Sequence, residues 1–108
     1  MRIIAGPCQH ESLIKSLEIA EHCQEICDKY NVEYYFKASF DKANRSHIDN
    51  TRGVGDNPWE SFVQTLTDFK QIKETLGVKI LTDIHERGQI GDIVRNGCID
   101  VVQIPAFL

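Results

Sequence analysis

The sequence lacks the features that mark membrane, secreted or nucleic-acid-binding proteins. No apolar stretch approaches the ~20 residues that a transmembrane helix needs. No charged-then-apolar signal segment precedes the polar residues that begin at Cys8. Positive charge is in the minority, with 12 Lys and Arg against 16 Asp and Glu and a formal charge of −4. This balance argues against a nucleic-acid or anionic-membrane partner, and we expect the protein to bind neither nucleic acid nor a membrane.

The cysteines also lack a diagnostic pattern. None of the four forms a C-x-x-C pair, and their spacing is not that of a secreted disulfide framework, which favours a reducing, cytoplasmic location. Cys23 and Cys27 are four residues apart, which predicts helix packing and not a metal site. Internal repeats, low-complexity tracts and interdomain linkers are missing too. The 42% hydrophobic content suffices for one modest core in 108 residues.

Short apolar runs alternate with longer amphipathic segments. We predict strands at residues 2–5, 32–36, 78–82 and 99–103. Helices are predicted from Ser12 as N-cap to about residue 30, from Asn57 as N-cap to residue 76, and more weakly over residues 86–96. Gly77 and Gly97 can close the second and third helices in left-handed geometry. Such alternation indicates an α/β fold with a parallel sheet and right-handed crossovers.

The periodicity of the first two helices predicts which side chains are buried. Apolar residues recur three and four positions apart, which is typical of a helix with one face in the core. In the first helix the predicted buried residues are Leu13, Leu17, Ile19, Ala20, Cys23, Ile26 and Tyr30. In the second they are Trp59, Phe62, Leu66, Phe69 and Leu76.

A polar segment follows each predicted strand, whereas the loops that enter the strands are plain. In order along the chain, these segments contain Pro7, Cys8 and Gln9; residues 37–46; Thr82, Asp83, His85 and Glu86; and Gln103, Pro105 and Ala106. The carboxyl ends of parallel strands lie on one side of the sheet, where ligands bind. The sequence therefore predicts a site at this edge.

Residues 37–46 carry the strongest signal, because two Lys, one Arg, an Asn and two Ser gather at a strand end in an acidic chain. That set suits an anionic ligand, since Arg offers a planar fork for phosphate and Lys a compact charge. The alternative is a solvated basic loop. Residues 38–57 show no convincing secondary structure, which is typical of a functional loop or a mobile surface loop. Arg52 and the two glycines after it favour a functional loop.

These segments together resemble the 3-deoxy-D-manno-octulosonate 8-phosphate synthase family. The matching motifs run in order along nearly the whole chain: Ile4-Ala5-Gly6-Pro7-Cys8 with Glu11-Ser12, residues 36–46, Arg52-Gly53, Thr82-Asp83-Ile84-His85-Glu86, and Gln103-Ile104-Pro105-Ala106-Phe107-Leu108. The related synthase of aromatic biosynthesis, which makes 3-deoxy-arabino-heptulosonate 7-phosphate, shares the Gly-Pro-Cys loop but has a different Lys/Arg motif. It ranks second.

The resemblance implies a TIM (β/α)8 barrel, of which this chain supplies about the first four strands and three helices as the N-terminal portion of a single catalytic domain. It implies an aldol-type condensation of phosphoenolpyruvate with arabinose 5-phosphate, which releases phosphate and feeds lipopolysaccharide assembly. Carbon 3 of phosphoenolpyruvate attacks the sugar aldehyde, water adds at carbon 2, and the carbon–oxygen bond to phosphate breaks. A homotetramer is implied as well.

The resemblance also assigns roles to residues. Lys37 and Lys42 match positions beside phosphoenolpyruvate, and Asp83 and His85 match polar groups at the reaction centre. The remaining matches are substrate contacts: Ser39, Asn44, Arg45, Ser46, Arg52, Gln103 and Ala106. Arg45 is the expected phosphate clamp of the sugar, and Ala106 is expected to contact phosphoenolpyruvate through its N–H.

Cys8 resembles the ligand found in the metal-dependent class of the family, whereas the other class has Asn there. A thiolate suits zinc or ferrous iron, and manganese is a further candidate for a divalent metal in the full-length protein. Taken alone, a single Cys is more often a small buried hydrophobe. One thiolate cannot hold a catalytic metal that needs three protein ligands, so no cofactor is assured in these 108 residues.

The remaining polar residues have plainer interpretations. We expect His10 and His22 at the surface, His47 in a loop, Cys98 at a strand entry, and Glu86 as a helix N-terminal acid. Because a (β/α)8 barrel needs ~250 residues, we expect the chain to be truncated and, on its own, inactive and poorly folded. A catalytically silent phosphate-sugar-binding unit with an open flavodoxin-like sheet, or a gene remnant, are the alternatives.

Overall fold

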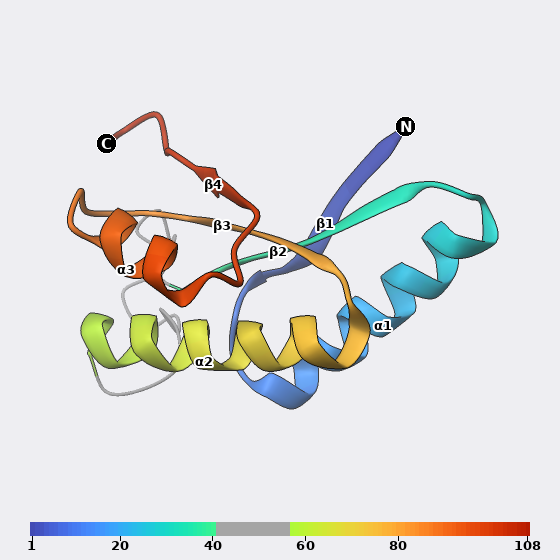
Figure 1. Ribbon diagram of the computed structural model, residues 1–108, viewed down its shortest axis with the longest axis horizontal. Coiled ribbons are helices and arrows are strands. Elements are labelled where there is room, and N and C mark those ends of the chain that lie inside the picture. Colours follow the sequence, from blue (N-terminus) through green and yellow to red (C-terminus); the bar gives the residue numbers. More distant parts are fainter. Residues whose placement is uncertain (41–56) are drawn as a thin grey trace.

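The computed structural model describes residues 1–40 and 57–108, which form a parallel sheet with helices on one face (Figure 1). The described elements, in chain order, are β1 (Arg2–Gln9), α1 (Leu13–Lys29), β2 (Glu33–Ser39), α2 (Pro58–Leu76), β3 (Lys79–Asp83), α3 (Gln89–Asn96) and β4 (Val101–Gln103). All strands and helices that the sequence predicts are present. None of the helices in the described ranges has the length and apolar character needed to cross a bilayer.

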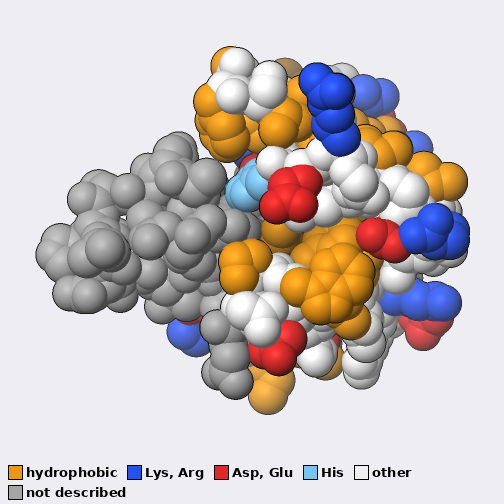
Figure 2. Space-filling view, turned by 90° about the vertical axis from the view of Figure 1, so that its left-hand side faces the viewer, with side chains coloured by type: hydrophobic (Ala, Val, Ile, Leu, Met, Phe, Trp, Pro, Cys, Tyr) orange, Lys and Arg blue, Asp and Glu red, His pale blue; other side chains and the backbone are white. Residues whose placement is uncertain are grey.

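The strands pair in the order β1-β2-β3-β4, and all three pairings are parallel. Sequential order with helices on a single face is the arrangement of consecutive βα units in a barrel wall, so the fold is compatible with part of a TIM barrel. It differs from the flavodoxin-like alternative, in which the strand order reverses and helices cover both faces. All strands end on the same side of the molecule, which Figure 2 views directly.

The helix ends are defined by the residues that the sequence predicts. The Ser12 hydroxyl accepts a hydrogen bond from the Lys15 N–H at 3.2 Å, and the Asn57 side chain accepts one from the Glu60 N–H at 2.9 Å. Gly77 and Gly97 end α2 and α3 with φ of 67° and 77°, a conformation that glycine adopts without steric cost.

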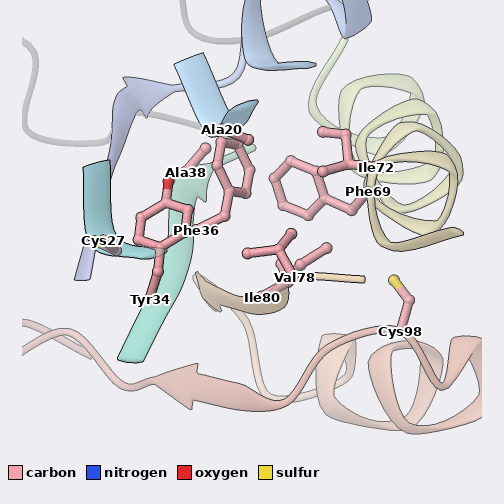
Figure 3. Close-up of a cluster of buried hydrophobic side chains, with 10 residues drawn as sticks. All are labelled: Ala20, Cys27, Tyr34, Phe36, Ala38, Phe69, Ile72, Val78, Ile80 and Cys98. Carbon is pink, nitrogen blue, oxygen red and sulfur yellow. The ribbon is translucent and has the colours of Figure 1, made fainter. Parts of the chain in front are cut away.

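The main core lies between the sheet and the helices α1 and α2 (Figure 3). Phe36 of β2 and Phe69 of α2 meet edge to face, with ring centroids 5.5 Å apart. Ten buried residues make up this cluster: Ala20, Cys27, Tyr34, Phe36, Ala38, Phe69, Ile72, Val78, Ile80 and Cys98. Cys23 packs against it, so the prediction that the cysteine pair of α1 serves helix packing is confirmed.

The predicted buried stripes are wrong at the helix ends. Ile26, Tyr30 and Trp59 are 58%, 68% and 61% exposed. Cys27, one position after Ile26, is the α1 residue that faces the core, and Tyr30 follows the last helical turn. Trp59 lies in the first turn of α2, where its ring contacts Phe62 at a centroid distance of 5.9 Å.

The first strand is longer than predicted, because it continues through the Gly-Pro-Cys segment to Gln9. Its register with β2 shifts between Ala5 and Cys8. A Cβ atom added to Gly6 would lie 1.7 Å from the carbonyl oxygen of Lys37, so only glycine fits against β2 here. Gly-Pro usually signals a turn, and that signal ended the predicted strand too early.

The opposite face of the sheet carries a charged cluster near the amino ends of the strands. The Glu33 carboxylate pairs with Arg2 at 3.0 Å and with Lys79 at 3.2 Å. Both cations also lie over the ring of Tyr35, with centroid distances of 4.9 and 5.3 Å. These contacts cross three strands and reinforce their register at the end remote from the predicted site.

Replacing Gly6 by alanine tests the close approach of β1 and β2. We expect Gly6→Ala to lower the free energy of unfolding by about 3 kcal/mol, because the new methyl group forces the two backbones apart. Gly88→Ala is the matched control, since a Cβ atom there meets nothing within 4 Å, and it should change stability by less than about 1 kcal/mol. Equal urea midpoints for the two variants would contradict the close approach.

Candidate active site

Strand pairing brings those predicted site residues that the structure describes to one edge of the sheet. Cys8 lies opposite Ala38, Gln9 opposite Ser39, and Asp83 opposite Gln103. The alternate residues Tyr34, Phe36, Ala38 and Ile80 pack toward the helices. Because side chains alternate along a strand, Lys37, Ser39 and Asp83 project from the other face. Two neighbouring strands, β2 and β3, therefore present an ammonium, a hydroxyl and a carboxylate at the same edge.

Lys37 is a cation that a central strand places at this edge. It is half-buried near the carboxyl end of β2, and its backbone pairs with Leu81 of β3. No carboxylate of the described residues forms an ion pair with its ammonium group. A positive charge held in place by a central strand, and not neutralised by those residues, suits an anionic ligand.

Asp83 and His85 form a nearly buried pair at the end of β3. His85 Nε2 lies 3.0 Å from Asp83 Oδ2. The imidazole stacks at a tilt on Phe40, with centroids 5.0 Å apart, and meets the edge of Phe107 at 6.1 Å. Phe40 is itself fixed, because its carbonyl accepts a hydrogen bond from the Ser61 hydroxyl at 2.7 Å. The ring of His85 thus has one defined orientation at the strand edge.

The charge on Asp83 is stabilised by its surroundings. Burial raises the pKa of this carboxyl, but the hydrogen bond from His85 lowers it, and the net pKa lies below the ordinary value. The Ser39 hydroxyl is close enough to contribute to this lowering, although the two groups do not reach hydrogen-bond geometry. The carboxylate is therefore the stable form at neutral pH.

Some buried polar atoms at this edge have no hydrogen-bond partner within the described parts of the chain. They include Ser39 Oγ and Asp83 Oδ1 on adjacent strands. An unsatisfied buried polar atom costs about 1–3 kcal/mol, so these two atoms are available to hydrogen-bond a group that reaches this edge. Both belong to the residues predicted from the sequence.

Cys8 is exposed at the end of β1 and has φ of 70°, an unfavourable conformation for a residue with a side chain. Residues 1–40 and 57–108 contain no group of three His, Cys, Asp or Glu side chains placed to hold a metal ion. The described residues thus supply one candidate thiolate and do not form a metal site by themselves.

The other predicted residues fall into two groups. Gln103, the last residue of β4, and Ala106, which follows that strand, are both exposed. The Gln103 carbonyl accepts a hydrogen bond from the Ile84 N–H at 3.2 Å. The rest lie outside the described residues: Lys42, Asn44, Arg45, Ser46, His47 and Arg52.

The prediction that His10 lies at the surface is wrong, whereas His22 is exposed as expected. The His10 side chain is fully buried, with Nδ1 2.7 Å from Ser16 Oγ and Nε2 2.7 Å from Asp68 Oδ2. The missed signal is Asp68, a charged residue directly before Phe69 on the apolar face of α2. Cys98 lies before β4, at the strand entry where it was predicted, and its side chain is buried.

Glu86 does not start the third helix, which begins at Gln89. The Gln89 side-chain oxygen accepts hydrogen bonds from the N–H groups of His85 and Glu86, at 2.7 and 3.0 Å. These bonds hold residues 85 and 86 in a loop, so the predicted helix begins three residues too early.

A sequence profile of the DAHP synthetase I family matches residues 1–108 of this chain. The chain belongs to the DAHP synthetase I family. Three similar relatives are all named 2-dehydro-3-deoxyphosphooctonate aldolase. The protein of Nitrobacter winogradskyi is 44% identical over 108 residues, which are 100% of this chain and 35% of the relative. That of Fusobacterium nucleatum is 46% identical over 106 residues, 98% of this chain and 35% of the relative.

The third relative, from Legionella pneumophila, is 41% identical over 106 residues, 98% of this chain and 36% of its own length. The shared name denotes the synthase that the motifs resemble, so the predicted resemblance is confirmed. The chain spans about a third of the length of these relatives. Membership of the DAHP synthetase I family therefore applies to every strand and helix described above.

The free energy of unfolding, measured as a function of pH in the acid range, tests the Asp83–His85 pair. A lowered carboxyl pKa stabilises the folded protein above the ordinary value of 3.8, and this contribution is lost as the pH falls below it. We expect the stability difference between the parent and Asp83→Asn to shrink between about pH 5 and about pH 3. A difference for Asp83→Asn that does not vary with pH would contradict the pairing.

Proposed function

We propose that the protein carrying this chain condenses phosphoenolpyruvate with D-arabinose 5-phosphate. Its products would be 3-deoxy-D-manno-octulosonate 8-phosphate and inorganic phosphate, in the biosynthesis of a lipopolysaccharide precursor. The observation that carries the proposal is the strand edge that presents Lys37, Ser39, Asp83 and His85 together. The relatives named 2-dehydro-3-deoxyphosphooctonate aldolase support the choice of reaction.

We propose further that the four strands belong to a closed (β/α)8 barrel forming one catalytic domain. The sequential parallel order and the single helical layer support this. The remaining strands would come from outside these 108 residues. The resemblance also supports a homotetramer. In such a barrel the sheet face with Lys37 and Asp83 lines the interior, and the strand ends form the floor of the site.

The proposed roles follow from the charge of the reactants. Lys37, together with Lys42, would hold the carboxylate and phosphate of phosphoenolpyruvate and stabilise charge that develops there. Asn44, Arg45, Ser46 and Arg52 would bind the sugar phosphate, with Arg45 as a bidentate clamp.

The residues of β3 and β4 would serve the reaction centre. Asp83 fixes the orientation of the His85 ring, so a polar group meets the sugar aldehyde at a defined place. Gln103, and the N–H of Ala106, would contact phosphoenolpyruvate. One water molecule is consumed, because the oxygen added at carbon 2 replaces the one that leaves with phosphate.

A second candidate is 3-deoxy-arabino-heptulosonate 7-phosphate synthesis, which uses a four-carbon sugar phosphate. The DAHP synthetase I profile favours it as an alternative, since the profile spans the whole chain. Competition between isotope-labelled four- and five-carbon sugar phosphates separates the two. We expect the five-carbon sugar to be consumed preferentially.

Phosphate release tests the proposal and the role of Lys37 together. The protein, purified from its complete reading frame, should release phosphate only when both substrates are present. Lys37→Met should lower kcat/KM by at least about 100-fold, because a charge aimed at the reacting anion is lost. Lys79→Met is the control, since Lys79 projects from the same sheet face at the opposite ends of the strands. No release from the parent would refute the reaction, and equal rates for both variants would refute the role of Lys37.

We propose Cys8 as one ligand of a divalent metal, with zinc, iron or manganese as candidates and other ligands from outside the described residues. We expect about one bound metal per chain in the purified protein, and a substoichiometric amount in Cys8→Ser. Cys23→Ala should keep the parent metal content, because Cys23 packs within α1 against the core. Equal elemental analyses for all three proteins would remove Cys8 from the metal site.

A further inference from the structure

A buried polar cluster lies behind the strand edge, on the helical side of the sheet. It consists of His10, which follows β1, Ser16 of α1 and Asp68 of α2, and the exposed Gln64 of α2 borders it. His10 and Ser16 are both 0% exposed, and Asp68 is 6% exposed. Gln64 Nε2 donates a hydrogen bond to Asp68 Oδ1 at 2.9 Å, so each Asp68 oxygen has a partner.

The order Ser16–His10–Asp68 is that of a nucleophilic triad, yet the cluster does not fit one. A nucleophilic hydroxyl must reach a substrate, whereas the Ser16 side chain is enclosed. The cluster is also separate from Asp83 and His85, which the proposed mechanism uses. Its chemistry is that of a fully hydrogen-bonded core, which fixes one arrangement of the elements that it joins.

The cluster is attached to the least regular part of the sheet. Between Ala5 and Cys8 the pairing with β2 shifts, Gly6 presses against the Lys37 carbonyl, and Cys8 has positive φ. Regular pairing alone does not define such a segment. Directly after it, the His10 N–H donates to the Ser39 carbonyl at 2.8 Å, and the His10 ring is bonded to both helices.

The ring of His10 is held on a third side as well. It meets Phe69 edge to face, with centroids 5.2 Å apart, and Phe69 meets Phe36 in the same way at 5.5 Å. His10 thus connects the end of β1 to the centre of the main core. A side chain with these contacts cannot turn without moving α1 or α2.

We propose that His10 is a positioning residue, which holds residues 6–9 in the irregular conformation that presents Cys8 and supports Lys37 at the strand edge. Ser16 and Asp68 act through it, from the two helices. The catalytic half of this inference rests on the proposed condensation. The structural half, the immobilisation of residues 6–10, does not.

The test combines hydrogen exchange with steady-state kinetics on the purified protein. His10→Leu fills a similar volume but removes both ring hydrogen bonds. We expect backbone amides of residues 6–10 to exchange at least tenfold faster, with exchange in β3 unchanged. We expect kcat to fall at least tenfold, while KM for arabinose 5-phosphate changes less than threefold, because the proposed sugar-binding residues follow β2.

Conservative variants separate positioning from simple packing. His10→Gln can reach Asp68 and His10→Asn can reach Ser16, so each should recover part of the lost kcat. Ile72→Val, in the same core but with no hydrogen bond in the cluster, is the control for lost stability. It should leave kcat and exchange at residues 6–10 as in the parent. If His10→Leu does not fold, Ser16→Ala and Asp68→Asn replace it. Both should also speed amide exchange at residues 6–10 and lower kcat.

The outcomes distinguish this inference from the proposed function. Unchanged exchange at residues 6–10 overturns the inference whatever the activity. Faster exchange with parental kcat overturns the positioning role. A parent without synthase activity overturns the proposed function alone, and exchange at residues 6–10, which needs no substrate, still decides whether His10 immobilises the strand end.

Discussion

Parallel pairing of four consecutive strands is the constraint on which the rest of this structure depends. It forces every strand to end on the same side, so residues 29 or more positions apart in sequence, such as Cys8 and Lys37 or Lys37 and Asp83, become neighbours. The helices return on one face only, which leaves the other face to carry polar side chains. On this face, Glu33 forms ion pairs with Arg2 and Lys79 near the amino ends of the strands, whereas the Lys37 ammonium lies near the carboxyl ends.

Buried side chains on the helical side hold the strand ends in place. The Thr82 hydroxyl donates to the Ala38 carbonyl at 2.8 Å, and the Ser61 hydroxyl donates to the Phe40 carbonyl at 2.7 Å. His10 does the same for β1 through its N–H and ring. Each bond satisfies a polar group that would otherwise be buried without a partner. The carboxyl edge of the sheet is therefore supported by buried hydrogen bonds from the helical side.

Local sequence signals predicted the elements and the site edge, but not the long-range contacts. Ser12, Asn57, Gly77 and Gly97 act within one helical turn, so their roles could be inferred from neighbouring residues. The continuation of β1 through Gly6 depends on the backbone of Lys37, 31 positions away, and the burial of His10 depends on Asp68, 58 positions away. No local pattern carries such information. Likewise Trp59 has the right helical spacing for the core, but its side chain is exposed in the first turn of α2.

The central claim is that the strand ends gather around an anionic reactant, and the position of bound phosphoenolpyruvate in a crystal of the protein tests it most directly. The account predicts the ligand at the carboxyl edge, with its carboxylate or phosphate within hydrogen-bond distance of Lys37 Nζ and near Ser39 and Asp83. Density for the ligand beside Arg2 and Lys79 at the amino ends, or on the helical face, would contradict it.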